Sequence, residues 1–277
     1  MTFSDLEVAV SQSSRKYGCI RDNIPALWTP GAGRSQHAYS RELAGAMLWE
    51  ADHFFDRALT LYLLRSNLRD LQASTWAGVA TYYTNYFLAL SFTRLHMRSV
   101  THLPATAVFA VTRTDDAAPF FRIEQRARRQ THTEVWETYY DIATQMAWPD
   151  ALTVMEIAPT LSSLRFREQV YRERINYRPG EGFGEIYTIR PRYLKSLKAE
   201  LMDDGGAPLT LSDAAYTDRM ASERLKHLAT LLHRLSGSRI DADVEDSSWR
   251  RRSDIVTRYA SDPAGRHFGE LLIGGAA

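Results

Sequence analysis

The side chains best suited to chemistry are concentrated between positions 171 and 178, directly before Pro179 and Gly180. This stretch carries arginines, an amide and phenols on about two turns of a predicted helix, which the proline and glycine then end. A planar guanidinium fits phosphate oxygens, an amide donates and accepts hydrogen bonds, and a phenol can stack or orient a phosphate. We predict that a ligand, RNA among the candidates, contacts Arg172, Arg174, Asn176, Tyr177 and Arg178.

Cleavage of RNA without a metal would need three groups. A base takes the proton from a ribose 2′-hydroxyl, an acid protonates the leaving oxygen, and a cation holds the charge that develops on the phosphate. Histidine suits proton transfer because its pKa lies near neutrality. The catalytic candidates are therefore His132 for proton transfer and Arg172 or Arg174 for the phosphate, if the helix that carries His132 packs beside theirs.

A second basic group lies near the C-terminal end, where Trp249 and Arg250 are followed by two further arginines. An indole can stack on a base while neighbouring guanidinium groups hold phosphates. We predict Trp249 and Arg250 as further nucleic-acid contacts.

Both basic groups also have a structural interpretation. Arg172 and Arg174 can pair with Glu168 and Glu173 on a solvated helix face. The arginines after Trp249 can be neutralised by the acidic run from position 241 to 246.

Composition narrows the class of protein. The net charge is +1, from 34 basic and 33 acidic residues, which argues against coating nucleic acid by bulk charge. Cys19 is the one cysteine, so no disulfide can form within the chain. No spacing of histidines or cysteines predicts a metal site, and no glycine-rich motif follows a predicted strand, so we expect neither metal nor cofactor. Without a signal peptide or a membrane-length apolar run, we expect a cytoplasmic protein with no membrane contact.

The periodicity of apolar residues predicts a mainly helical fold. Two long helices, over 41–71 and 74–98, follow one another after a capping serine, Ser40, and should pack as an antiparallel hairpin. β-Branched and aromatic runs at 105–112 and 120–124 predict a short β-hairpin-like insertion. Helices should resume at 132–146 and, towards the C-terminus, at 212–235 and 253–260.

Three segments, in this order, resemble motifs of the HEPN superfamily (higher eukaryotes and prokaryotes nucleotide-binding domain). The segment Trp76–Leu90 resembles the family's A-x-x-x-Y-Y-x-x-F/Y-x-A helix. Gln130–Trp136 resembles its K-T-H-S-x-hydrophobic helix start, and Arg172–Tyr177 resembles the R-x-x-x-D/N-Y end of its last core helix. Together the segments cover about residues 41–190.

The resemblance implies an antiparallel helical bundle that is often dimeric and that works in toxin–antitoxin or antiviral defence systems. Nuclease members of the family place a histidine four to six positions after their arginine. Here the positions after Arg172 hold Tyr177, Arg178 and Pro179, so the usual nuclease motif is not found. The resemblance therefore favours binding over the usual catalysis.

We accordingly predict a HEPN-like helical bundle over 40–202, with the extended insertion near 105–124. An irregular segment, 1–39, precedes it, and a helical extension, 208–277, follows it. The leading functional hypothesis is a dimeric binding or effector subunit that contacts RNA, a nucleotide or a partner protein. The alternatives are a metal-independent RNase with an altered site and a purely structural bundle.

Overall fold

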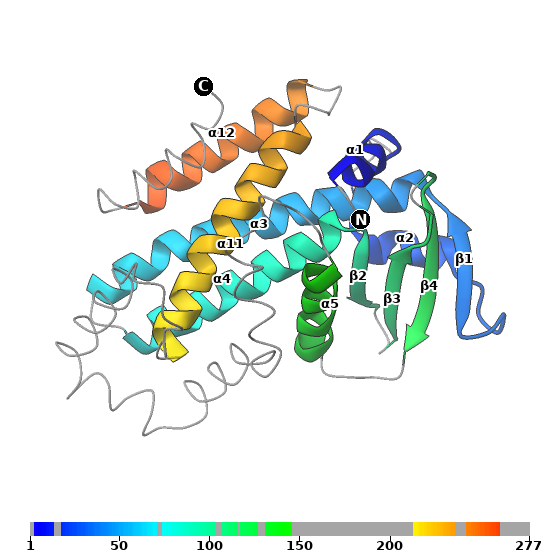
Figure 1. The fold of residues 1–277 in the computed structure, drawn as a ribbon, viewed down its shortest axis with the longest axis horizontal. Coiled ribbons are helices and arrows are strands. Elements are labelled where there is room, and N and C mark those ends of the chain that lie inside the picture. The colour runs from blue at the N-terminus through cyan, green and yellow to red at the C-terminus, as the bar shows by residue number, and fades with distance from the viewer. Residues whose placement is uncertain are drawn as a thin grey trace.

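A computed structural model describes most of the chain, namely residues 3–13, 18–70, 74–103, 107–115, 117–126, 131–145, 213–236 and 242–260. The described part is largely helical and contains one small antiparallel sheet. The long helices lie at one end of the molecule and the sheet at the other (Figure 1). The helices are α1 (Phe3–Ser11), α2 (Ile20–Leu27), α3 (Arg41–Asp70), α4 (Ser74–Leu95), α5 (Thr131–Gln145), α11 (Asp213–Ser236) and α12 (Ala242–Tyr259).

The predicted hairpin of long helices is confirmed by α3 and α4, which pack along their length (Figure 1). Ser40 caps α3, because its Oγ accepts a hydrogen bond from the backbone N–H of Leu43 at 3.0 Å. The second helix ends earlier than its periodicity predicts, at Leu95. Met97 then adopts a left-handed backbone conformation with φ of 56°, which turns the chain into a strand.

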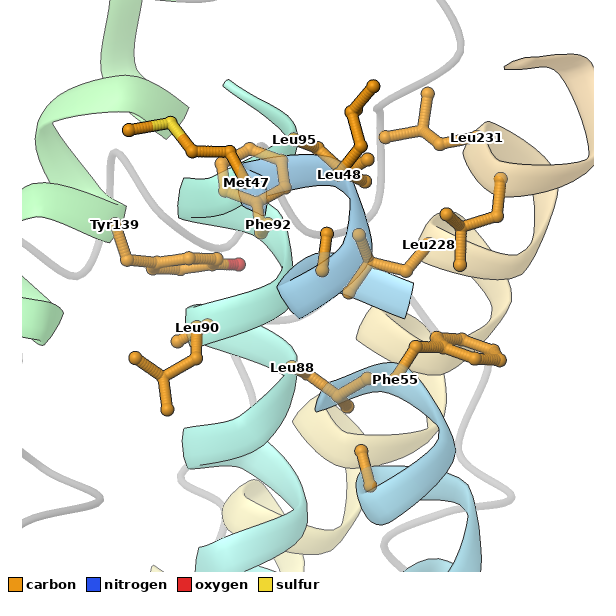
Figure 2. Close-up of a cluster of buried hydrophobic side chains, with 14 of the residues drawn as sticks. Met47, Leu48, Phe55, Leu88, Leu90, Phe92, Leu95, Tyr139, Leu228 and Leu231 are labelled. Carbon is orange, nitrogen blue, oxygen red and sulfur yellow. The ribbon is translucent and has the colours of Figure 1, made fainter. Parts of the chain in front are cut away.

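The core lies where α11 and α5 pack against this hairpin. Figure 2 shows how side chains of the four helices meet. They are Met47, Leu48 and Phe55 of α3, Leu88, Leu90, Phe92 and Leu95 of α4, Tyr139 of α5, and Leu228 and Leu231 of α11. All of these are buried, so a continuous apolar core holds the helices in fixed positions.

The sheet has the strand order β1-β4-β3-β2, with every neighbouring pair antiparallel. Its strands are β1 (Ser35–Tyr39), β2 (Arg98–His102), β3 (Val108–Arg113) and β4 (Phe120–Arg126). The hairpin of β3 and β4 confirms the predicted insertion. Two outer strands that the sequence did not indicate extend it into a sheet.

One face of the sheet is covered by the N-terminal segment. Ile20 and Ile24 of α2 belong to the same buried cluster as Phe121 and Ile123 of β4. Trp28 packs edge-on against Phe109, with 5.0 Å between ring centroids. The residues before Ser40, expected to be irregular, therefore contribute α1, α2 and β1 to the fold.

The C-terminal helices complete the described part. Helix α11 matches the predicted span, 212–235, to within a residue at each end. Helix α12 begins at Ala242, well before the predicted start at position 253, because the acidic run falls within its first turns. Carboxylates are favourable at the amino end of a helix, where the macrodipole is positive.

Candidate functional site

The structure brings together some of the predicted site residues and does not describe others. Arg172, Arg174, Asn176, Tyr177 and Arg178 all lie outside the described residues. His132, Trp249 and Arg250 lie within described helices, the first in α5 and the other two in α12.

His132 lies at the start of α5, where it packs against α4. Its Nδ1 shares a hydrogen bond of 2.8 Å with the phenol oxygen of Tyr82. Its ring stacks on that of Tyr86, with 4.2 Å between centroids and 18° between planes. Tyr82 is fully buried and His132 is half-buried, and these contacts hold the imidazole in one orientation. A histidine whose ring is held in one orientation is suited to binding or proton transfer.

A buried arginine lies in the same region. Arg224 of α11 donates from Nε to the Tyr139 phenol oxygen at 3.1 Å and from Nη1 to Asn85 Oδ1 at 2.6 Å. Its guanidinium also lies 5.1 Å from the ring centroid of Trp136 and 4.8 Å from that of Tyr139. Asn85 continues the network by donating to the backbone oxygen of Thr217 at 2.7 Å. These contacts join α4, α5 and α11 immediately beside the His132 contact.

The sequence analysis did not single out Arg224, although its position held a signal. Arg224 is four residues from Met220 and four from Leu228, so all three lie along one face of α11. A charged residue within an apolar helix stripe is rarely buried unless it is paired. An arginine at such a position therefore predicts an internal polar network.

The basic group near the C-terminus serves mainly to attach α12 to α3. Arg252 Nε lies 2.9 Å from Asp56 Oδ1, and Arg251 Nη2 lies 2.8 Å from Asp52 Oδ2. Each arginine contacts both carboxylates, and Ser248 donates to Asp52 at 2.8 Å. Asp52 and Asp56 of α3 thus neutralise Arg251 and Arg252. Arg250 is exposed on α12, where it remains a candidate contact together with Trp249.

A second ion-pair network attaches α11 to α3. Asp218 accepts from Arg65 Nε at 2.9 Å and from Arg69 Nη2 at 2.8 Å. Burial by itself would raise the pKa of the Asp218 carboxyl. The charges and hydrogen bonds of the two arginines outweigh burial and lower the pKa from 3.8 to about 2.

This shift predicts a loss of stability in acid. Because the pKa of Asp218 is lower in the folded chain than in the unfolded one, its contribution is fully present above pH 3.8 and is lost as the pH falls towards 2. At 1.36 kcal/mol per pKa unit the contribution is about 2 kcal/mol. Urea unfolding of wild type and Asp218→Asn across this range should show their difference in unfolding free energy shrinking as the pH falls. If the difference in unfolding free energy did not change with pH, the lowered pKa of Asp218 would not be the source of this stability.

The described residues contain no group of three or more His, Cys, Asp or Glu side chains arranged to hold a metal ion. None of the described helices is long and apolar enough to span a membrane. No family model, curated protein or solved structure matches this chain.

Proposed function

We propose that this chain is a HEPN-like binding or effector subunit that contacts RNA, as a homodimer or with a partner protein, in a cytoplasmic defence or toxin–antitoxin-like system. One observation carries the proposal. Two of the family-like segments, one in α4 and one at the start of α5, meet through Tyr82, Tyr86 and His132. Two of the three family-like segments, about fifty residues apart in the sequence, are thus in contact.

The geometry around His132 favours binding over catalysis. A metal-independent RNase needs a cation aimed at the phosphate as well as a histidine. Arg224, a cation near this contact, has its guanidinium buried among Asn85, Trp136 and Tyr139. Its charge therefore serves the packing of three helices, whereas His132 is only half-buried.

The proposal is tested by incubating the purified full-length chain with a labelled RNA pool in EDTA. We expect retention of RNA that weakens with salt, without cleavage. Retention should be reduced in Arg172→Ala and in His132→Ala. Each lost phosphate contact should lower the slope of log K against log salt by about 0.7 for single strands. Arg21→Ala is the matched control, because the Arg21 side chain is 62% exposed and pairs with its neighbour Asp22, at 3.6 Å. Wild type that retains no RNA, or variants that retain as much as wild type, would overturn the proposal.

The hydrogen bond between Tyr82 and His132 supports a second candidate, a metal-independent RNase with an altered site. An imidazole fixed through Nδ1 is oriented for general acid or base work. In that case wild type cleaves RNA in EDTA, and both His132→Ala and Arg172→Ala abolish cleavage while keeping the helical circular dichroism spectrum. A purely structural bundle would neither retain nor cleave RNA.

A further inference from the structure

The sheet presents a second face, opposite the one covered by α2. Side chains at alternate positions of a strand share a face, and antiparallel partners lie directly opposite one another. Tyr39 of β1 pairs with Phe120 of β4, and His37 pairs with Arg122. These four side chains therefore share one face, while Phe121 and the other inward residues of β4 point to the core.

Two aromatic rings stand exposed on this face. Tyr39 is 53% exposed and Phe120 is 42% exposed, and together with Trp76 they are the large apolar side chains exposed in the described part of the chain. The two rings form an edge-to-face pair, with 5.3 Å between centroids and 69° between planes. Exposing a pair of aromatic rings side by side forfeits apolar burial, which is typical of a surface that a partner covers.

Basic side chains continue from the aromatic pair across the sheet. The register places His37, Arg122, Thr112 and Arg98 in one row over all four strands, a span of about 14 Å at 4.8 Å per strand. Arg126 adds a further cation on β4. The side chains of Arg122 and Arg126 are 49% and 39% exposed, so their charges face solvent.

Two acids, Glu124 and Glu134, contact this basic surface. Glu124 is on the same face of β4, 3.9 Å from Arg122 and 3.8 Å from Arg126. Exposed pairs at these distances are weak, so the arginines can exchange partners with a ligand. Arg126 also lies 4.0 Å from the buried Glu134 of α5. With three arginines against these two glutamates the group keeps a net positive charge. A carboxylate among phosphate-binding groups can accept a hydrogen bond from a ribose 2′-hydroxyl, which DNA lacks.

We propose that this face of the sheet binds single-stranded RNA. Unpaired bases stack on Tyr39 and Phe120, Arg122 and Arg126 hold phosphates, and Glu124 accepts from a 2′-hydroxyl. Aromatic rings beside cations on an open surface suit unpaired bases, because bases within a duplex have no free ring face. The surface is built on β1 and β4 from residues other than Tyr82, Tyr86 and His132, although Arg126 reaches α5 through Glu134. The inference therefore does not depend on the function proposed above.

Fluorescence anisotropy with labelled oligoadenylate of about 16 nucleotides tests the aromatic pair. Stacking contributes about 1–3 kcal/mol per base, so Tyr39→Ala and Phe120→Ala should each weaken binding by about 5- to 150-fold. Tyr39→Phe, which keeps the ring, should bind like wild type. Trp76→Ala removes an exposed ring from α4 and should leave the affinity unchanged.

The charged residues are tested by the salt dependence of the same association. Arg122→Ala should lower the slope of log K against log salt by about 0.7, whereas Arg21→Ala should not change it. Single-stranded RNA should bind more tightly than single-stranded DNA of the same sequence or duplex RNA, and Glu124→Ala should narrow the gap between RNA and DNA.

Several results would overturn the inference. The first is that the Tyr39→Ala/Phe120→Ala variant binds single-stranded RNA with the same affinity as wild type. The second is that wild type binds duplex RNA more tightly than single-stranded RNA. The third is that wild type binds single-stranded DNA and single-stranded RNA with equal affinity. Binding of none of these nucleic acids, with self-association that Tyr39→Ala abolishes in light scattering, would assign the face to a protein interface instead. Circular dichroism of every variant separates lost binding from lost folding.

Discussion

Asp56→Ala should lower the free energy of unfolding by about 3–5 kcal/mol, because it removes one partner from a buried ion-pair network. Asp56 and Arg252 are 7% and 3% exposed, and Arg252 also lies over the Phe55 ring, 4.8 Å from its centroid. Burial raises the pKa of Asp56 even though Arg252 opposes the shift, which indicates how costly an uncompensated charge is here. Without Asp56, the buried guanidinium of Arg252 keeps its pair with Asp52 but loses half of the negative charge that these two carboxylates supply. Urea unfolding followed by far-ultraviolet circular dichroism measures the loss.

Arg251→Ala provides the matched control on the same helix. Its side chain is 38% exposed, so water screens its pairs with Asp52 and Asp56, and the loss should be about 1 kcal/mol or less. Replacing both buried partners, as Asp56→Leu with Arg252→Met, should recover much of the stability that Asp56→Ala loses, because no charge is left unpaired. If Asp56→Ala cost no more than Arg251→Ala, the network would not anchor α12 to α3.

This network marks a limit of the sequence analysis. The periodicity of α3 was predicted correctly, but the burial of Asp52 and Asp56 was not. They lie four and eight residues after Leu48, on the buried side of the helix. Two acids at that spacing on an apolar face indicate a buried partner. The partner itself, about two hundred residues away on α12, cannot be identified from local sequence.

In the sheet, too, one strand is indicated by its own residues, whereas others depend on residues that are distant in the sequence. The β-branched residues of Val108–Arg113 indicated β3 by themselves. The sequence Ser-Gln-His-Ala-Tyr of β1 has no β-branched residue, and it becomes a strand because β4 offers a pairing edge. Likewise β2 begins where Met97 adopts a positive φ, a conformation that sequence analysis expects of glycine.

The candidate site could be predicted in part. His132 was proposed because of its residue type and its place at a helix start, and the structure adds its contacts with Tyr82 and Tyr86. The aromatic face of the sheet was not predicted, because the pairing of Tyr39 with Phe120 joins strands about eighty residues apart. Tertiary structure decides which exposed residues lie on the same surface, and local periodicity does not carry that information.

The second large effect is expected for Arg224→Ala, which should lower the free energy of unfolding by about 3–4 kcal/mol. The substitution removes a large buried side chain and leaves a cavity. It also removes the guanidinium that donates to Asn85 Oδ1 and to the Tyr139 phenol, and a buried acceptor left without its donor costs about 1–3 kcal/mol. Arg224→Lys keeps the charge but not the planar fork that reaches both acceptors, so it should recover only part of the stability.

Lys226→Ala, two residues further along α11, is the matched control, because its side chain is 54% exposed and pairs with Glu223 at 3.4 Å. Its loss should stay below about 1 kcal/mol. A double-mutant cycle of Arg224→Ala with Asn85→Ala should give a coupling energy of about 0.5–3 kcal/mol, because the residues share one hydrogen bond within a network. Additive losses, or equal losses for Arg224→Ala and Lys226→Ala, would mean that the hydrogen bonds of Arg224 do not help to hold α11 in place. Coupling would instead show that Arg224 fixes the positions of α4 and α5, and with them the contact of Tyr82 and Tyr86 with His132.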